Sequence, residues 1–459
     1  MTKWTLSEIA EATEGVVYYA KDETIKIKEV SFDSRNLSEG SLFVPLVAER
    51  NGHEYITSAI ENGASATLWS DSIEKAPKDI PVILVKDTLT ALQEFSKWYL
   101  KKVHPKVVGV TGSNGKTTTK DMIAAVASAK FKTHKTVGNF NNHIGLPYTI
   151  LEMPEDTEVA VLEMGMSQAR EIHVLSVLAE PDIAVITMIG ESHIEFFGSK
   201  SGIADAKLEI ADGLKADGTL IYLGEEPLLS ERIDKINTVK TRTFGKTDKE
   251  DLYSISIEPD VKSTKFSVNL VPELTITLPT PGEYNVQNAL AALSVGLELG
   301  IEIEAGAEKL EHFQLTKNRL EWLEGFNGAQ LLNDAYNASP SSMKAVLNYF
   351  SNIEAKGQKI VVLGDILELG SLSESLHKSV AESINAEAID QLVLYGDEMG
   401  IVYEQVKEQF STENIRHFSG DKKPLIDYLR KTVQKNDMVL LKSSLGTGIL
   451  GVVEELKRK

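Results

Sequence analysis

Two glycines, a lysine and a threonine in the first third of the chain are the residues best suited to chemistry. They lie in the segment KVVGVTGSNGKTTTKDMIAAVASAKF, which begins at Lys106 with an apolar run and continues as an alanine-rich helical pattern. Gly112 and Gly115 let backbone amides approach an anion closely, the helix start adds partial positive charge, and Lys116 adds a full charge. Thr117 follows where a phosphate loop places the hydroxyl that holds magnesium. The pattern therefore predicts a site for the phosphates of ATP or GTP.

This loop differs from the usual phosphate loop. The common pattern G-x-x-x-x-G-K-[ST] would need glycine at Val110, whereas this chain has the shorter G-x-x-G-K-T. A second Gly-Lys-Thr triplet, from Gly245 to Thr247, opens into charged residues instead of an apolar helix. Context therefore favours the first triplet, for which the alternative is a glycine-rich turn between a strand and a helix.

Length and composition are those of an ordinary globular chain. The 459 residues allow about three domains, and 42% hydrophobic residues can form ordinary cores. No window has the apolar run of a signal peptide or a membrane span, so we expect a cytoplasmic protein. Because the chain has no cysteine, any metal must rest on oxygen and histidine ligands, which suits magnesium. A net charge of −19 argues against nucleic acid or an anionic membrane as partner.

Residues 1–101 predict a small α/β domain, because helical patterns alternate there with short apolar runs. Nothing in this part predicts catalysis. Four polar residues, however, lie at predicted strand ends and loops, where they could bind the polar head group of a substrate. Ordinary turn chemistry is the alternative. These residues are Ser34, Arg35, Asn51 and His53.

Residues 102–316 predict a second domain around the phosphate loop. Apolar strands alternate with amphipathic helices, which is typical of a parallel sheet whose ligands bind at the carboxyl ends of the strands. Glu163 ends one such strand, His193 follows the next, and Lys207 lies on the helix after it. A capping or solvated carboxylate, a surface histidine and a solvated helix lysine are the alternatives. Asn288, in a later helix, could read a nucleobase edge or simply pack.

Residues 317–459 predict a third domain, since the alternation of strands and helices resumes as in a doubly wound sheet. This part has no phosphate loop of its own. The third domain would therefore contact a nucleotide held by the middle domain from the other side of a cleft. The polar residues at its predicted strand ends are Asp334, Tyr336, Asn337, Asp365 and Lys442.

The chain resembles the Mur ligases, a family that builds the cell-wall peptide by ATP-driven amide bond formation. The resemblance rests on the segments TGSNGKTTTK, EMG, GIADAKLEI, EYNVQNALAA, LTKNRLE and NDAYNASPSS. It implies a small N-terminal α/β domain, a central ATP-binding domain with a parallel sheet of the P-loop type, and a C-terminal Rossmann-like domain. Within the family, GNFNNHIGLPYTIL, NDAYNASPSS and GDILELG resemble the members that add D-alanyl-D-alanine to UDP-N-acetylmuramoyl tripeptide.

The resemblance also implies roles for individual residues. ATP would be bound by Gly112, Ser113, Asn114, Gly115, Lys116, Thr117, Thr118, Asn288, Arg319 and Asp334. Magnesium would be held by Thr117, Glu163, His193 and a carbamylated Lys207, and catalysis would rest on Lys116, His193 and Lys207. The UDP end of the substrate would lie at Ser34, Arg35, Asn51, His53, Asn141 and Asn142, and the dipeptide at Asn337 and Lys442.

Two segments depart from the family pattern. Leu208 stands where glycine usually follows the lysine, and the late strand reads Lys442-Ser443-Ser444-Leu445 instead of KGSxS. Three alternatives remain: a ligase of the family that adds a single amino acid, a folate-type polyglutamate ligase, and an NTP-hydrolysing switch or motor. GNFNNHIGLP and NDAYNASPSS argue against the first two, and a switch would carry the longer phosphate loop. We expect a monomer.

Overall fold

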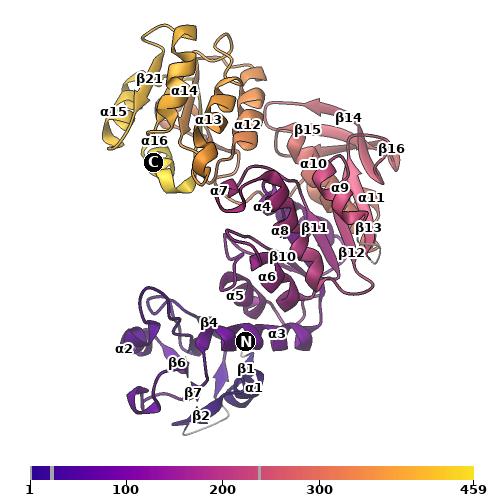
Figure 1. Ribbon diagram of the computed structural model, residues 1–459, viewed down its shortest axis with the longest axis vertical. Coiled ribbons are helices and arrows are strands. Elements are labelled where there is room, and N and C mark those ends of the chain that lie inside the picture. The colour runs from indigo at the N-terminus through magenta and orange to yellow at the C-terminus, as the bar shows by residue number, and fades with distance from the viewer. Residues whose placement is uncertain (1–2, 21–24, 236–238, 459) are drawn as a thin grey trace.

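The computed structural model describes residues 3–20, 25–235 and 239–458. Its strands form three main sheets of five, nine and six strands, which follow one another along the chain. We call the parts built on these sheets the N-terminal, middle and C-terminal units. Figure 1 shows them as a crescent in which the middle unit joins the other two. The predicted α/β fold class is confirmed, and the domain borders near 101 and 316 stay predictions.

The N-terminal unit has the strand order β2-β7-β6-β5-β4, in which β2 runs antiparallel to β7 and the other neighbours pair in parallel. The Asp87 carboxylate caps the last helix by accepting from the Thr90 amide. The elements are β1 (Trp4–Thr5), α1 (Leu6–Ala12), β2 (Val16–Tyr18), β3 (Lys26–Ile27), β4 (Glu29–Ser31), β5 (Ser41–Phe43), α2 (Ile56–Glu61), β6 (Ala64–Trp69), β7 (Val82–Leu84) and α3 (Thr88–Val103).

The middle unit has the strand order β16-β15-β14-β13-β12-β11-β8-β10-β9. Neighbours pair in parallel from β9 to β14, whereas β14, β15 and β16 form an antiparallel extension that goes beyond the parallel sheet we expected. The elements are β8 (Lys106–Thr111), α4 (Lys116–Ala127), β9 (Thr133–Lys135), α5 (Gly145–Glu152), β10 (Val159–Glu163), α6 (Glu171–Ala179), β11 (Ile183–Ile186), α7 (Ile194–Phe197), α8 (Lys200–Leu208), β12 (Thr219–Leu223), α9 (Pro227–Ile233), β13 (Lys240–Gly245), β14 (Leu252–Pro259), β15 (Thr264–Val268), β16 (Val271–Leu278), α10 (Glu283–Glu298) and α11 (Ile303–Leu310).

The C-terminal unit has the strand order β17-β18-β22-β19-β20-β21, with β17 antiparallel to β18 and the rest parallel. The Ser339 hydroxyl caps its first helix by accepting from the Ser342 amide. The elements are β17 (Glu321–Glu324), β18 (Gln330–Asp334), α12 (Pro340–Asn352), β19 (Lys359–Gly364), α13 (Ser373–Ala381), β20 (Gln391–Tyr395), α14 (Met399–Val406), β21 (Ile415–Phe418), α15 (Lys423–Thr432), β22 (Met438–Lys442) and α16 (Ile449–Leu456).

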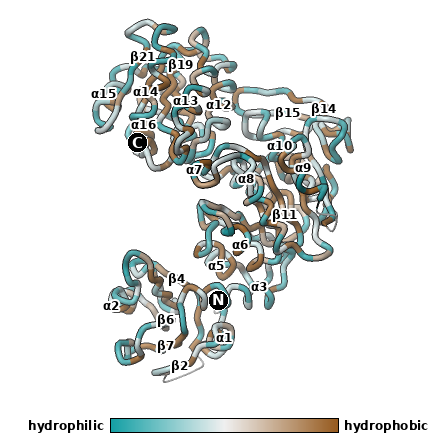
Figure 2. Tube along the Cα trace, in the orientation of Figure 1, coloured by the Kyte–Doolittle hydropathy of each residue, from teal (hydrophilic) through white to brown (hydrophobic). Residues whose placement is uncertain are grey.

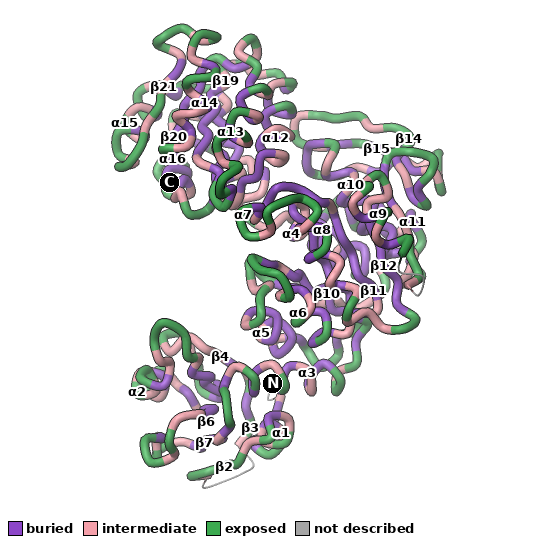
Figure 3. Tube along the Cα trace, in the orientation of Figure 1, coloured by how far each residue is buried: buried purple, intermediate pink, exposed green. Residues whose placement is uncertain are grey.

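The central strands of the middle sheet are apolar except at their ends, because both of their faces are covered. In β10, Val161 belongs to the core that includes α4 and α10, whereas the next residue, Leu162, belongs to the core that includes α5 and α6. Figures 2 and 3 show the same arrangement as apolar, buried strands beneath polar, exposed loops. Among the described residues, no helix is both long and apolar enough to cross a membrane. Because helices cover both faces of the sheet, polar side chains are accommodated at the ends of its strands.

Candidate active site

The phosphate loop lies between β8 and α4 and needs both of its glycines. Gly112 and Gly115 have φ values of +150° and +83°, which residues with a side chain rarely adopt. A Cβ atom on Gly112 would lie 1.8 Å from the Thr187 hydroxyl oxygen, and one on Gly115 would lie 2.5 Å from Asn288 Oδ1. Lys116 Nζ donates to the Gly112 carbonyl oxygen at 2.6 Å. The loop therefore holds an ammonium group within a tight backbone turn at a helix start, as phosphate binding requires.

The second Gly-Lys-Thr triplet has no such geometry. Gly245 ends β13, and the chain continues through a turn into β14 instead of a helix. Lys246 is paired with Glu283 at 2.6 Å on the surface. The triplet therefore lacks the helix start that a phosphate site uses.

Lys116 and Lys207 place two amines close to one another inside the protein. Burial lowers the pKa of Lys116 to about 8, although the nearby Glu163 carboxylate acts in the opposite direction. Lys207 on α8 is only 1% exposed. Burial, together with the positive charge of Lys116, holds the pKa of Lys207 well below its ordinary value. The structure thus excludes the alternative that Lys207 is a solvated helix lysine.

Within the described part of the chain, one carboxylate oxygen of Glu163 has no hydrogen-bond partner. Its Oε1 accepts from Asn141 Nδ2 at 2.9 Å, and its amide donates to the Thr136 hydroxyl at 3.0 Å. Oε2 is buried and has no hydrogen-bond partner among the described residues. A buried carboxylate oxygen is costly to leave unpaired. A cation at this oxygen would remove that cost, and the buried Thr117 at the start of α4 offers a hydroxyl to the same loop.

His193 faces the C-terminal unit. It precedes α7 with a φ of +65°, and its Nδ1 lies 2.5 Å from Glu368 Oε2. The His193 side chain holds the pKa of Glu368 below its usual range. In the described part of the chain, no three His, Asp or Glu side chains converge on a possible metal position. A second metal at His193 would therefore need a ligand of another kind.

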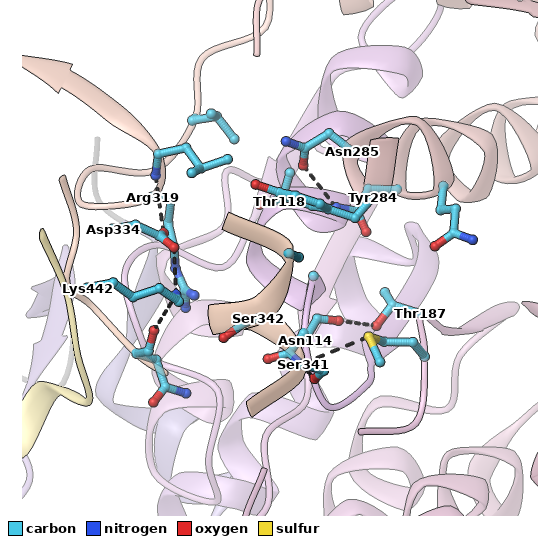
Figure 4. A pocket seen from close by; sticks show the side chains of 18 residues that line it. Asn114, Thr118, Thr187, Tyr284, Asn285, Arg319, Asp334, Ser341, Ser342 and Lys442 are labelled. Carbon is cyan, nitrogen blue, oxygen red and sulfur yellow. Dashed lines mark hydrogen bonds and ion pairs between the residues drawn. The ribbon is translucent and has the colours of Figure 1, made fainter. Parts of the chain in front are cut away.

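One cavity of about 140 Å³ lies between the middle and C-terminal units (Figure 4). It brings together predicted residues from five segments of the chain, and they are Asn114, Gly115, Thr118, Asn288, Arg319, Asp334, Asn337 and Lys442. Sequence reasoning missed several lining residues, among them Thr187, Met188, Tyr284, Asn285, Gln287, Ser341 and Ser342. The only signal for Tyr284 and Gln287 was their place in the segment EYNVQNALAA. Six of the ten residues predicted to bind ATP thus line one cavity, whereas Gly112, Ser113, Lys116 and Thr117 do not line it.

Hydrogen bonds fix the walls of this cavity. Asn288 Oδ1 accepts from the Thr119 hydroxyl at 3.1 Å, which ties α10 to the phosphate-loop helix. Asn114 Nδ2 of the phosphate loop donates to the hydroxyl oxygens of Ser339 and Ser341 at 3.0 and 3.1 Å. The C-terminal unit therefore contacts the phosphate loop directly.

Arg319 and Asp334 lie on the C-terminal wall. The Arg319 guanidinium lies over the Tyr336 ring, 4.5 Å from its centroid. Asp334 Oδ2 accepts from Lys442 Nζ at 2.6 Å, and Lys442 also donates to the Asn337 carbonyl oxygen at 3.1 Å. Asn337 and Lys442 both line the predicted nucleotide cavity, and their role at the dipeptide stays a prediction.

Most of the residues expected at the UDP end make internal contacts. Asn51 Oδ1 lies 2.8 Å from Nδ1 of the buried His53, whose Nε2 accepts from the Ser70 amide at 3.1 Å. Asn142 Oδ1 accepts the Gly145 amide at 2.8 Å at the start of α5. Arg35 is exposed and pairs with Asp33 at 2.9 Å, and the Ser34 carbonyl oxygen accepts from Asn62. Of these residues, the structure leaves the Arg35 side chain most accessible to a ligand.

Known proteins match the whole chain. Residues 110–296 match the Mur ligase middle domain, and residues 318–445 match the Mur ligase, glutamate ligase domain. The chain is 44% identical, over 99% of each chain, to UDP-N-acetylmuramoyl-tripeptide–D-alanyl-D-alanine ligase of Bacillus subtilis. It is 31% identical to the Escherichia coli protein of that name, over 100% of this chain and 99% of the other.

Solved structures agree. MurF from Acinetobacter baumannii superposes with a TM-score of 0.87 at 28% identity, covering 99% of each chain. MurF ligase from Thermotoga maritima in complex with ADP superposes with a TM-score of 0.78 at 28% identity, covering 93% of this chain and 96% of the other. The chain therefore belongs to the Mur ligase family.

Proposed function

We propose that this chain is the ATP-dependent ligase that joins D-alanyl-D-alanine to UDP-N-acetylmuramoyl tripeptide in peptidoglycan precursor synthesis. The observation that carries the proposal is the cavity in which the phosphate loop and Asn288 face Arg319 and Asp334. Full-length relatives bear the name of this activity. We place the enzyme in the cytoplasm and expect it to act as a monomer.

The chemistry needs the peptide carboxylate to acquire a leaving group. The carboxylate attacks the γ-phosphoryl group of ATP in line, which gives an acyl phosphate and ADP. The free amine of D-alanyl-D-alanine then attacks the acyl carbon, and phosphate leaves from the tetrahedral intermediate. Lys116 and the phosphate-loop amides neutralise charge on the transferring group, and closure of the units around the cavity positions the reactants.

Magnesium fits the donors at the phosphate loop. The unpartnered oxygen of Glu163 and the hydroxyl of Thr117 are hard oxygen ligands of the kind magnesium prefers. When bound, the ion would neutralise charge on the β- and γ-phosphates. We place a second metal at His193, with Glu163 and a carbamylated Lys207 as its other ligands.

Carbamylation of Lys207 needs a neutral amine. The lowered pKa that burial gives Lys207 supplies this form. The amine nitrogen forms a bond to the carbon of CO₂, a proton leaves, and the carbamate carries one negative charge in place of the positive one. An anion there would also relieve the repulsion between Lys207 and Lys116.

For the substrate's UDP end we retain the N-terminal unit, with Arg35 as its most accessible predicted contact. Asn141 extends toward the predicted metal ligand Glu163, since its side-chain amide donates to the Glu163 carboxylate. It is therefore better placed to support the metal site than to hold the UDP group. For the dipeptide we retain Asn337 and Lys442, whose Nζ donates to Asp334 Oδ2 and to the Asn337 backbone carbonyl oxygen.

ATP turnover with and without the two substrates tests this proposal. We expect rapid ADP release only when UDP-N-acetylmuramoyl tripeptide and D-alanyl-D-alanine are both present, with a product of matching mass. A panel of shorter UDP-muramyl peptides with single amino acids should give little turnover. Robust hydrolysis without either substrate would favour the switch or motor alternative, and preference for a single amino acid would favour another ligase of the family.

A further inference from the structure

The chain leaves the middle unit at Thr316, where it is anchored to the phosphate-loop helix. Up to Leu315 the chain packs on the core that contains α4, α10 and α11. The Thr316 amide and hydroxyl then both donate to Asp121 Oδ2 on α4, at 3.0 and 2.8 Å. Two donors from one residue to one carboxylate oxygen hold this point of the chain against the middle unit.

A second anchor, two residues later, belongs to the C-terminal unit. Asn318 Oδ1 accepts from Asn333 Nδ2 at 2.8 Å, and the Leu320 amide donates to Asp334 Oδ1 at 3.3 Å. Lys317, between the two anchors, is exposed. It makes no side-chain hydrogen bond or ion pair with any other described residue. A change in the angle between the units would therefore be concentrated at this residue.

The turn after Lys317 places Arg319 in the wall of the nucleotide cavity. Asn318 and Leu320 have φ values of +65° and +46°, and such values are uncommon for side-chain-bearing residues and rare for leucine. Arg319 between them lies over the Tyr336 ring and lines the cavity. Its position thus depends on a constrained turn whose starting point is Thr316.

Asp121 is held in place from its other side. It is 2% exposed, and its Oδ1 lies 2.6 Å from Lys135 Nζ and 3.2 Å from Lys120 Nζ. Burial acts to raise the pKa of Asp121, but the two lysines outweigh it, so the carboxylate stays ionised. Lys120 also donates to the Thr136 carbonyl oxygen at 2.8 Å, and the Thr136 hydroxyl accepts the Glu163 amide. The contacts of Asp121 are therefore connected, through Lys120 and Thr136, to the hydrogen bond that holds the Glu163 backbone.

We propose that Asp121 and Thr316 form a hinge anchor that fixes the position from which Arg319 enters the nucleotide cavity, with Lys317 as the pivot. Asp121 and Thr316 are positioning residues, since they act through Arg319 and do not line the cavity. The inference rests on the proposed function, because it takes that cavity as the ATP site. When the anchor is broken, a smaller fraction of the molecules holds Arg319 in the position that binds ATP. The apparent ATP affinity falls in proportion to that fraction.

Calorimetric binding of the non-hydrolysable analogue AMP-PNP with magnesium to the full chain tests the anchor. Thr316→Val lacks the hydroxyl donor and should bind at least about fivefold more weakly than wild type. Thr316→Ser keeps the donor and should bind like wild type. In an Arg319→Ala background, Thr316→Val should weaken binding no further, because the anchor acts through Arg319.

Asp121→Asn is the second disruption, and Asp182→Asn is its matched control. Asp182 pairs with Lys106 at 3.0 Å and with Lys215 at 2.8 Å. It lies just before β11, at the amino ends of the central strands, whereas the phosphate loop lies at their carboxyl ends. Asp121→Asn should weaken binding as Thr316→Val does, and Asp182→Asn should not. If Asp121→Asn does not fold, the Thr316 variants decide, since that side chain is only half-buried.

Three results would overturn the anchor: wild-type binding by Thr316→Val, an equal loss in Thr316→Ser, or an undiminished loss in the Arg319→Ala background. Failure of the proposed function would look different. The wild type would then bind the analogue without joining the two substrates, and the differences among the variants would still decide on the anchor.

Discussion

Replacing Lys116 by alanine is expected to lower turnover by at least about a hundredfold, because it removes a full positive charge from the transferring phosphoryl group. In the structure its ammonium donates to the Gly112 and Ser113 carbonyl oxygens, so the loop itself holds the group ready for phosphate. Turnover is measured with UDP-N-acetylmuramoyl tripeptide, D-alanyl-D-alanine and saturating magnesium. Thermal unfolding of the same preparation reports whether the variant is folded.

Lys246→Ala is the matched control, because Lys246 occupies the second Gly-Lys-Thr triplet. Its only ion pair in the described part of the chain is the surface contact with Glu283. Its replacement should change the free energy of unfolding by no more than about 0.5 kcal/mol and leave turnover intact. A well-folded Lys116→Ala variant with near-normal turnover would contradict the role given to Lys116.

The lowered pKa of Lys116 adds a pH dependence to this prediction. With a pKa of about 8, the amine of the unliganded protein is charged below pH 8 and loses its charge as the pH rises through that value. Polyphosphate binds the charged form better, so apparent ATP affinity of the wild type should fall above pH 8. In Lys116→Ala this part of the pH profile should be absent.

The strands of the three sheets could be predicted where both of their faces are covered. The runs VVGV, VAVLE and KIVVLG are apolar except for one terminal residue in each of the last two, Glu163 and Lys359, and they lie in β8, β10 and β19. Strands with mixed or polar sequences were missed, such as β13 (KTRTFG) and β21 (IRHF), because their alternation is weak over so few residues. The order of the parallel strands depends on pairing between distant segments, which local patterns do not encode. The antiparallel β14–β16 extension, in contrast, is made of consecutive strands joined by short connections.

The same limit applies to the site. The phosphate loop is a local motif, so its sequence was enough to locate it. The dipeptide role of Lys442, in contrast, was implied by the family resemblance and stays a prediction. What the sequence did not predict is the ion pair of Lys442 with Asp334 on the cavity wall, which the parallel pairing of β18 with β22 brings about. The contact between His193 and Glu368 likewise depends on how the C-terminal unit docks.

Lys207 shows most clearly what helical spacing conceals. On α8 its position is compatible with a solvated lysine, but packing of the middle unit leaves the side chain 1% exposed. No hydrogen bond or ion pair to its ammonium is found among the described residues, and Lys116 adds like charge nearby. A permanently charged, unpaired ammonium in such a place is costly. Conversion to a carbamate would replace this charge by an anion suited to a metal.

We therefore expect Lys207 variants to lose turnover for lack of an anionic oxygen ligand. Loss of groups that merely support metal ligands typically costs about 10- to 100-fold, so loss of the ligand itself should cost at least about a hundredfold. Lys207→Met, which nearly conserves side-chain volume, should fold and be almost inactive. Lys207→Arg should be no better, although it keeps the positive charge, because its guanidinium cannot become a carbamate.

Chemical rescue separates the carbamate from a packing role of Lys207. Lys207→Ala leaves space where the side chain was, and formate or acetate bound there would supply the missing oxygens. Turnover of Lys207→Ala should therefore rise with added carboxylate, whereas Lys207→Met, with that space filled, should not respond. Carbon-13 NMR of the wild type in labelled bicarbonate should show a carbamate signal that both variants lack. Wild-type turnover by a folded Lys207→Met variant at saturating magnesium would show that the assignment is wrong, and the second metal would then have to rest on Glu163 and His193.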